Sequence, residues 1–246
     1  MNMKKALAYT ALLTIILIGS YACSDNDGYS LGDFRISIAT VVPEGDTSYY
    51  LLLDNGDKLR PSMSDVYYSA KANQRVFLNY TILGDGKDNY DYYVKINDIW
   101  NILTKPVIDL TEANADSIGN DAVRINQFWI GNDYLNTSFL FNYGGVRPHA
   151  INLVQNKIMS GEDNAEVLEL ELRHNSFNSQ SNRLYEGLAC FDLKPFREEG
   201  KDSIPIKILV KDWDGEKEYN VMYKYNELNK TNHVAAMPTI SSNEYE

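Results

Sequence analysis

The chain has 246 residues and a formal net charge of −11, from 34 acidic residues against 23 lysines and arginines. Such a chain repels phosphate backbones unless it carries a local basic face, and beyond the two lysines at 4–5 its basic residues are scattered singly. We therefore expect no nucleic-acid partner. Tyrosine is abundant, with 18 residues, many of them at alternate positions, which favours β-strands over helices.

Residues 1–22 have the pattern of a bacterial lipoprotein signal peptide. Two lysines near the start are followed by an uncharged, mostly apolar run at 6–18 and by the small residues of 19–22, where a peptidase would cut. Cys23 is then the lipid-modified first residue of the mature chain. The alternative, a transmembrane helix, is disfavoured because polar residues interrupt the run and it is shorter than the roughly 20 apolar residues of a span. Ser20 departs from the leucine that most such signals carry at this position.

Ser24, Asp25, Asn26 and Asp27 follow the cysteine directly. This acidic run resembles the surface-export signal of Bacteroidetes lipoproteins, and the tether at 23–30 has too little apolar surface to fold. The pattern predicts an outer-membrane lipoprotein on the cell surface rather than one facing the periplasm, with the membrane as a partner through the lipid. Without its signal peptide the chain keeps 21 basic and 34 acidic residues, a formal charge of −13, which keeps a protein soluble at an exposed surface.

Residues 31–110 are expected to form a small OB-like β-barrel of about five strands, because apolar and polar residues alternate in short runs. Asn55-Gly56, between two such runs, is the strongest local hairpin signal, since both central residues of a type I′ turn need positive φ. Phe34, Ile36 and Ile38 alternate with polar residues, and Val76, Leu78, Tyr80 and Ile82 share one face. Tyr90, Tyr92, Val94 and Ile96 are expected to point inward.

Residues 120–228 are expected to form an antiparallel, immunoglobulin-like β-sandwich after a polar linker at 112–121. One polar face per strand indicates antiparallel sheets whose apolar faces pack together. Residues 229–246 are expected to form a polar C-terminal tail. The predicted apolar rows are Phe139, Phe141 and Tyr143; Leu168, Leu170 and Leu172; Ile204, Ile206, Ile208 and Val210; and Tyr219, Val221, Tyr223 and Tyr225.

Several segments of the chain resemble the NigD-like family of Bacteroidetes lipoproteins. They are Cys23–Tyr29, Leu31–Phe34, Leu168–Asn175 and Cys190–Leu193. The resemblance covers essentially the whole mature chain and implies an N-terminal OB-like barrel followed by a C-terminal β-sandwich. The family takes its name from a gene found beside a bacteriocin, which implies an immunity or accessory role for one member. The resemblance implies no catalytic residue that maps onto this chain.

No catalytic constellation stands out in the sequence. The three histidines, His149, His174 and His233, are far apart and lack a metal-ligand spacing, so each is interpreted as an isolated surface or turn residue. Cys190 lies in an apolar stretch and is interpreted as a buried small hydrophobe rather than a nucleophile. The acidic turn at 54–57 lacks the spaced glutamate and flanking helices of a calcium loop. We therefore expect no metal, no cofactor and no catalytic residue.

Trp213 gives the most specific hint of a ligand-binding residue. It stands between Asp212 and Asp214 in a predicted hairpin turn, where an exposed aromatic ring could stack on a sugar. The alternative is that the ring folds back over an edge of the core. Short motifs around Ser117 and Ser203 also resemble the O-glycosylation sites of exported Bacteroidetes proteins.

Three functions remain open from the sequence. The leading hypothesis is a non-catalytic, lipid-anchored cell-envelope protein that binds or shields a surface partner, as a bacteriocin-immunity protein would. One alternative is a glycan-binding accessory lipoprotein that uses Trp213. The other is an unrecognised hydrolase, because no catalytic pair of carboxylates can be singled out in so acidic a chain.

Overall fold

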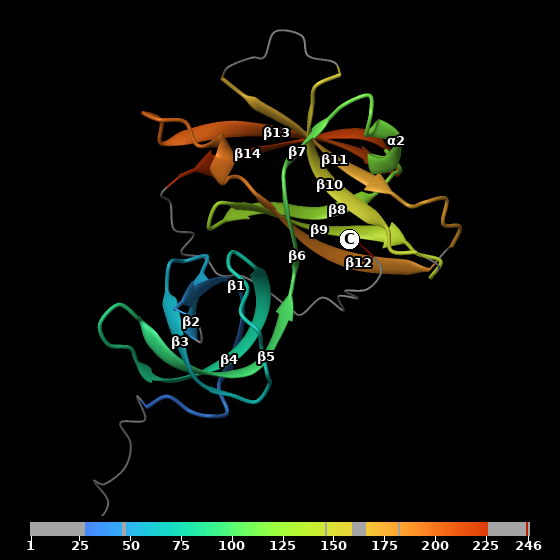
Figure 1. Cartoon of the computed structure of the whole chain (residues 1–246). Helices are drawn as coiled ribbons and strands as arrows, with labels where there is room; N and C mark the ends of the chain where they lie inside the picture. The colour runs from blue at the N-terminus through green and yellow to red at the C-terminus, as the bar shows by residue number, and fades with distance from the viewer. Residues whose placement is uncertain are drawn as a thin grey trace, which may run out of the picture.

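The computed structural model confirms the all-β architecture expected from the sequence, a small barrel followed by a β-sandwich (Figure 1). The signal peptide, Cys23, the export signal at 24–27 and His233 lie outside the described residues. The structure describes residues 28–45, 48–145, 147–158, 166–181, 183–225 and 245.

The N-terminal domain is a closed five-stranded barrel in the order β1-β2-β3-β5-β4. Its strand pairs are antiparallel except for β3 with β5. The predicted apolar row from Val76 to Ile82 faces the barrel core, where its members are at most 4% exposed. The strands are β1 (Phe34–Glu44), β2 (Ser48–Leu53), β3 (Lys58–Ser64), β4 (Arg75–Asp85) and β5 (Tyr92–Asn101).

The predicted hairpin at Asn55-Gly56 joins β2 and β3, but its turn is not of type I′. Gly56 has a φ of 93°, whereas Asn55 is not in the left-handed region. The Gly56 amide donates to the carbonyl of Leu53 at 2.9 Å, and the Asp57 amide donates to the Asn55 side chain at 3.0 Å. These local bonds fix the turn and hold Asp54, directly after β2, at the junction with the second domain.

The C-terminal domain packs a five-stranded sheet, β14-β13-β11-β10-β7, against a four-stranded sheet, β6-β12-β9-β8. Most pairs are antiparallel, but β7 pairs with β10, β6 with β12 and β11 with β13 in parallel. The predicted rows on β11 and β13 are buried, and Leu170 and Ile208 are fully so. The elements are β6 (Leu103–Pro106), β7 (Ile108–Leu110), α2 (Ala115–Ile118), β8 (Arg124–Gly131), β9 (Tyr134–Asn142), β10 (Ala150–Asn156), β11 (Leu168–Asn175), β12 (Leu184–Asp192), the 3₁₀ helix η2 (Lys194–Phe196), β13 (Ser203–Asp212) and β14 (Gly215–Lys224).

The chain leaves the barrel earlier than its sequence pattern indicates. The pattern places 31–110 in the barrel and a linker at 112–121, but β6 and β7 are strands of the sandwich and α2 lies within the expected linker. Strands of four and three residues are too short for alternation to reveal which sheet they join. Of the expected tail at 229–246 only Tyr245 is described, and its side chain is buried.

A buried ion pair lies where the two domains meet. Arg75, the first residue of β4, is fully buried, and its guanidinium donates two hydrogen bonds to the Asp54 carboxylate at 2.7 and 2.8 Å. It also donates to Thr40 Oγ1 at 3.0 Å and, across the junction, to Asn136 Oδ1 on β9 at 3.2 Å. Burial disfavours the charged guanidinium, but the charge of Asp54 outweighs this effect, so the pKa of Arg75 is raised.

Neutral contacts from the sandwich surround the ion pair. The Asn132 side chain, in the turn between β8 and β9, donates to the last two carbonyls of β2 at 3.1 and 2.8 Å. The hydroxyl of Tyr134 donates to the carbonyl of Asn73 at 3.1 Å. Gly131 lies so close to Asp54 that an added Cβ would stand 2.1 Å from Oδ2. The apolar cluster that completes the junction contains Ile38, Phe77, Ile102, Tyr134, Leu188 and Cys190.

Replacing Arg75 by methionine should lower the free energy of unfolding by about 3–5 kcal/mol, because the Asp54 carboxylate is left buried without its partner. Asp54→Leu should lower it by a similar amount, and the double variant should lose clearly less than the sum of the two. Equilibrium urea unfolding of the four proteins measures these differences. Additive losses would contradict a direct coupling of the two side chains.

Gly131→Ala tests the same junction without removing a charge, because its methyl group would collide with the Asp54 carboxylate. It should lower the unfolding midpoint. Gly84→Ala is the matched control, since an added Cβ there meets nothing within 4 Å and Gly84 is not in the left-handed region. The control should change stability by no more than about 0.5 kcal/mol.

Candidate binding site

The structure brings Asp212, Trp213 and Asp214 together at the turn between β13 and β14. Trp213 is 36% exposed, and its ring packs on the guanidinium of Arg124, which lies 4.6 Å from the ring centroid. The ring is therefore neither fully exposed nor folded over the core, because one face is covered by a side chain of β8. The rest of the indole is exposed to solvent.

The two carboxylates of this corner are already paired with cations. Asp214 binds Arg124 at 2.6 Å, and the buried Asp212 binds Lys217 at 3.1 Å and Arg124 at 3.6 Å. Burial acts to raise the pKa of Asp212, but the hydrogen bond from Lys217 and the neighbouring charges outweigh it, so the pKa is lowered. Both carboxylates thus position Arg124 beneath Trp213, which leaves them less available to a ligand.

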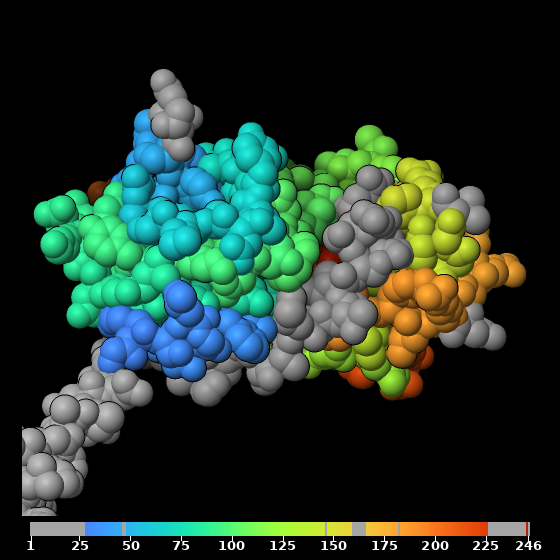
Figure 2. Space-filling model, turned by 90° about the horizontal axis from the view of Figure 1, so that it is seen from below, coloured from blue at the N-terminus to red at the C-terminus, as the bar shows by residue number. Residues whose placement is uncertain are grey.

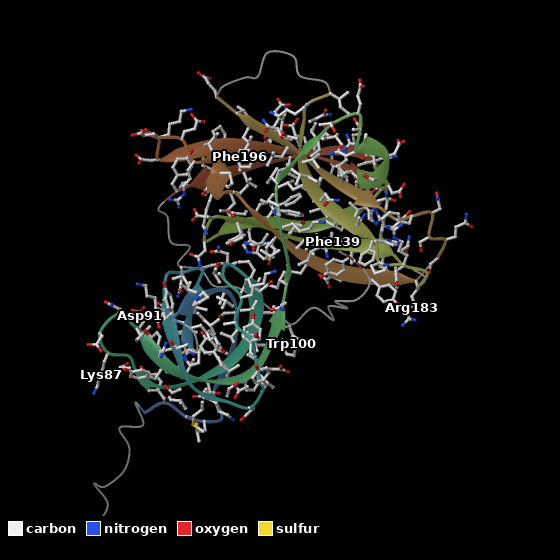
Figure 3. All side chains as sticks on the ribbon, in the orientation of Figure 1. Lys87, Asp91, Trp100, Phe139, Arg183 and Phe196 are labelled. Carbon is white, nitrogen blue, oxygen red and sulfur yellow. The ribbon has the colours of Figure 1, made fainter. Side chains whose placement is uncertain are left out.

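A second group of side chains, which the sequence did not single out, lies on the outer wall of the barrel. We call Glu44, Tyr50, Lys58, Arg60 and Tyr90 the barrel aromatic face. Their neighbours Leu51, Leu53 and Leu59 are at most 2% exposed and point into the barrel, so the alternate residues of β2 and β3 point outward. The loop between β4 and β5 brings Tyr90 beside them, and Figure 3 shows Lys87 and Asp91 of this loop on the side of the barrel away from Trp100.

The barrel aromatic face is held together by a network around Glu44. This carboxylate accepts hydrogen bonds from Arg60 and from the Tyr90 hydroxyl, both at 2.6 Å. The rings of Tyr50 and Tyr90 lie 6.1 Å apart, Lys58 lies 5.8 Å from the Tyr50 centroid, and Arg60 lies 5.4 Å from the Tyr90 centroid. The hydrogen bond to Glu44 raises the pKa of Tyr90, so its hydroxyl stays protonated.

This arrangement suits binding by stacking, cation–π contact and hydrogen bonding. OB-type barrels bind their ligands over strands 2 and 3 and the adjoining loops, which is where these side chains lie. Part of the barrel aromatic face could have been predicted from the sequence, from the outward positions on either side of the Asn55-Gly56 hairpin. Tyr50, Lys58 and Arg60 occupy those positions. The sequence pattern predicts that Tyr90 points inward, but it precedes β5, lies in the loop and joins this face only through the fold.

Two of the three histidines are buried and paired, which corrects the interpretation of them as isolated surface residues. Pairing of β10 with β11 places His149 Nδ1 3.0 Å from His174 Nε2, across 25 residues of sequence. Their residues are 0% and 3% exposed. His174 Nδ1 faces the carbonyl of Ala122 at 3.2 Å and must donate to it, so its Nε2 accepts a hydrogen bond from the Nδ1–H group of His149.

Tyr245 closes the side of the sandwich next to the histidine pair. It forms a β-bridge with His149, and its hydroxyl lies 2.9 Å from both the amide and the carbonyl of Leu188 on β12. Its ring also meets that of Phe139, with centroids 5.3 Å apart, and Phe139 lies between the two sheets (Figure 3). Within the parts of the chain that are described, no three potential metal ligands lie together.

Cys190 is fully buried at the junction, as the sequence predicts. Its thiol donates to Asn136 Oδ1 at 3.0 Å, and burial raises the pKa of Cys190 to about 12. The thiol is therefore protonated at neutral pH and is a poor nucleophile. In the described residues no helix has the length and apolar character needed to cross a membrane.

Family models match both domains of the chain. The model of the NigD-like N-terminal OB domain matches residues 38–102, and that of the NigD-like C-terminal β-sandwich domain matches residues 106–223. The chain belongs to the NigD-like family. The two matches meet at β6, which agrees with the junction in the structure rather than with a linker at 112–121.

Solved structures match the chain along most of its length. A Parabacteroides distasonis protein whose name relates it to toxins is 36% identical, with a TM-score of 0.69, over 79% of this chain and 95% of its own. A Bacteroides vulgatus protein of unknown function is 34% identical, with a TM-score of 0.69, over 80% and 93%. A NigD-like immunity protein of Bacteroides caccae shares the fold at 21% identity and a TM-score of 0.62, over 80% and 99%. A comparison with curated proteins gives no match.

The histidine pair should make the stability of the protein fall as the pH falls. Burial, and then the neighbouring His149, lower the pKa of His174 to about 4, and burial also lowers that of His149. The nearby Asp121 acts in the opposite direction without reversing the shift. In the unfolded chain the histidines have pKa values of about 6.5. As the pH falls, the unfolded chain therefore binds protons that the folded chain does not bind.

The contribution of His174 to the free energy of unfolding should therefore be complete above pH 7. Through His174 alone, the free energy of unfolding should fall by about 2 kcal/mol between pH 7.5 and pH 5. Urea unfolding at several pH values measures this slope. His174→Gln cannot take up the proton and should flatten the slope, even though the variant starts from a lower stability. An unchanged slope in the variant would show that other groups cause the pH dependence.

Proposed function

We propose that this NigD-like protein is a non-catalytic lipoprotein of the outer membrane, displayed on the cell surface, that binds a partner protein through the barrel aromatic face. The lipid anchor rests on the pattern around Cys23, and surface display rests on the acidic run at 24–27. An immunity-like role is supported by the Bacteroides caccae relative, which is named an immunity protein, and by the toxin-related name of the Parabacteroides distasonis relative.

The observation that carries the proposal is the set of rings and cations positioned by Glu44. Tyrosine and arginine are enriched where protein interfaces draw most of their binding energy. The hydrogen bonds of Arg60 and Tyr90 to Glu44 fix these side chains before binding, which reduces the entropy lost on association. The face has two cations and one carboxylate, although the chain as a whole is strongly acidic. We therefore expect acidic side chains on the partner.

A second candidate function, glycan binding, is favoured by the Trp213 corner. The partly exposed indole is backed by Arg124, which fixes the plane of the ring. A fixed aromatic plane at the tip of a hairpin is suited to stacking on a sugar. The pairing of Asp212 and Asp214 with cations leaves this corner with fewer free hydrogen-bonding groups for sugar hydroxyls than an unpaired set would offer.

Lipid attachment is tested by metabolic labelling with an alkyne fatty acid in cells that express the protein. The parent should carry the label and Cys23→Ser should not, whereas Cys190→Ala, which changes a buried thiol, should keep it. Replacing residues 24–27 by alanine should retain the label but protect the protein from protease added to intact cells. Label on Cys23→Ser would contradict the proposed anchor, and unchanged proteolysis would contradict the export signal.

A survival assay distinguishes the two binding candidates. A host strain that lacks the protein is made to express the parent or a variant and is then exposed to bacteriocin preparations from neighbouring strains. The parent should restore survival, and the double variant Tyr50→Ser, Tyr90→Ser should reduce protection at least tenfold, because interface rings of this kind contribute about 1–3 kcal/mol each. Trp213→Ala should protect like the parent. Thermal unfolding of each purified variant checks that the fold is kept.

Other outcomes of this experiment are equally informative. Full protection by the tyrosine double variant would overturn binding through the barrel aromatic face. If Trp213→Ala alone lost function, and also lost binding on a glycan array, the glycan candidate would replace the protein-partner one.

A further inference from the structure

Exposed apolar side chains gather at the end of the barrel where the chain enters it. We call Tyr29, Leu31, Phe34, Met63 and Tyr67 the apolar rim. Leu31 is 75% exposed, Phe34 65%, Met63 58% and Tyr67 95%. Seen from below, the segment that starts at Gly28 and the segment around the end of β3 lie side by side on the surface of the barrel (Figure 2). Large exposed apolar side chains that gather on one part of a surface are typical of a contact surface.

The barrel holds the N-terminal part of the rim in place. The Tyr29 hydroxyl donates to the Asp85 carboxylate, and its ring meets that of Tyr92 with centroids 6.4 Å apart. Phe34 is paired with Thr81 of β4 at the start of β1. Leu31 lies in the turn between Tyr29 and Phe34, which are both held in place. Its side chain remains exposed because it cannot pack into the barrel core.

The position of Cys23 limits how far this surface can stand from a membrane. Four residues, 24–27, lie between Cys23 and Gly28, where the described chain starts, so the chain takes five residue steps from one to the other. At about 3.3–3.6 Å per extended residue they span at most about 18 Å. The apolar rim is therefore the part of the folded protein that a lipid on Cys23 keeps nearest to the bilayer, which makes the bilayer its expected occupant.

We propose that the apolar rim rests in the interfacial layer of the membrane that holds the lipid on Cys23. Attachment then has two points, the acyl chains and the rim, with the barrel end-on to the bilayer and the sandwich held away from it, as the arrangement in Figure 1 implies. Tyrosine rings suit this layer, because they combine an apolar body with a polar tip, and leucine, phenylalanine and methionine supply apolar area beneath it. The proposal rests on the proposed lipid attachment.

The charges near the rim do not favour an electrostatic attachment. Asp33 and Arg35 are both exposed and carry opposite charges, and the carboxylate of Asp65 is paired with Lys95 at 2.6 Å. Because the described residues of this end form no basic cluster, contact should depend on apolar area and should not require anionic lipid. Vesicles of phosphatidylcholine alone are therefore the appropriate probe.

The test uses residues 23–246 coupled through Cys23 to maleimide lipid in phosphatidylcholine vesicles. Cys190 is fully buried and should not react, and Cys23→Ser checks this. Because the coupling is chemical, the result does not depend on whether cells lipidate Cys23, so failure of the anchor and failure of the rim are distinguishable. Tryptophan is introduced as Phe34→Trp, as Tyr67→Trp or, in the control, as Leu184→Trp on the sandwich, where the native leucine is 52% exposed.

Brominated phosphatidylcholine should quench the added fluorescence of the Phe34→Trp and Tyr67→Trp variants by at least half, and that of Leu184→Trp hardly at all. Equal quenching at the three positions, or none at the rim, would overturn the proposal. A dependence of the rim quenching on added phosphatidylglycerol would also overturn it, since attachment would then be electrostatic.

A second measurement guards against a local effect of the new tryptophans. Hydrogen exchange of residues 28–36 should slow several-fold when the parent is coupled to vesicles, compared with the free chain. The double variant Leu31→Ser, Phe34→Ser should lose this protection, whereas the matched control Ile158→Ser, Leu184→Ser on the sandwich should keep it. Equal protection in both double variants would overturn a contact made by the rim.

Discussion

The arrangement of the two domains depends on one buried ion pair. Moving the charges of Arg75 and Asp54 out of water costs free energy. The attraction within a buried ion pair offsets that cost only when its geometry is good and its remaining hydrogen-bonding groups are satisfied. Here the carboxylate binds the guanidinium through two bonds, and Thr40 and Asn136 take further donors of Arg75. Among the described residues, Arg75 Nε has no hydrogen-bond partner. Because Asn136 belongs to the sandwich and the other groups to the barrel, the full set of bonds from the two terminal nitrogens forms only when the domains sit in one relative position.

The sequence predicts what depends on alternation and misses what depends on contact between distant strands. The rows on β4, β11 and β13 are long enough for a period of two to identify both strand and buried face. Asp54 sits in a turn motif that predicts a hairpin and carries no sign of a partner 21 residues away. His149 and His174 share no motif either, since a strand pairing joins them. The barrel aromatic face could be predicted only in part, because Tyr90 reaches it through a loop.

The two ring-bearing surfaces solve the same physical problem in different ways. An exposed aromatic side chain loses rotational freedom when it binds, so a ring fixed in advance binds at a lower entropic cost. Trp213 is fixed by a cation beneath its face, Arg124, which is itself oriented by two carboxylates. The tyrosines of the barrel are fixed by a hydroxyl bond and by cations from β3. In the first arrangement both carboxylates are already paired with cations, whereas the second leaves Lys58 outside the Glu44 network and able to meet a partner.

An anchor and a rigid junction together decide which surfaces a partner can reach. A lipid alone leaves the attached body free to rotate about its tether, so a partner would meet any face. A contact between the barrel end and the bilayer would remove most of that freedom, but only for the barrel. The junction around Arg75 would carry this orientation to the sandwich, because a sandwich displaced from the barrel would deprive a buried guanidinium of the Asn136 acceptor. The same ion pair that positions the domains would therefore also set the direction in which the distal domain faces away from the membrane.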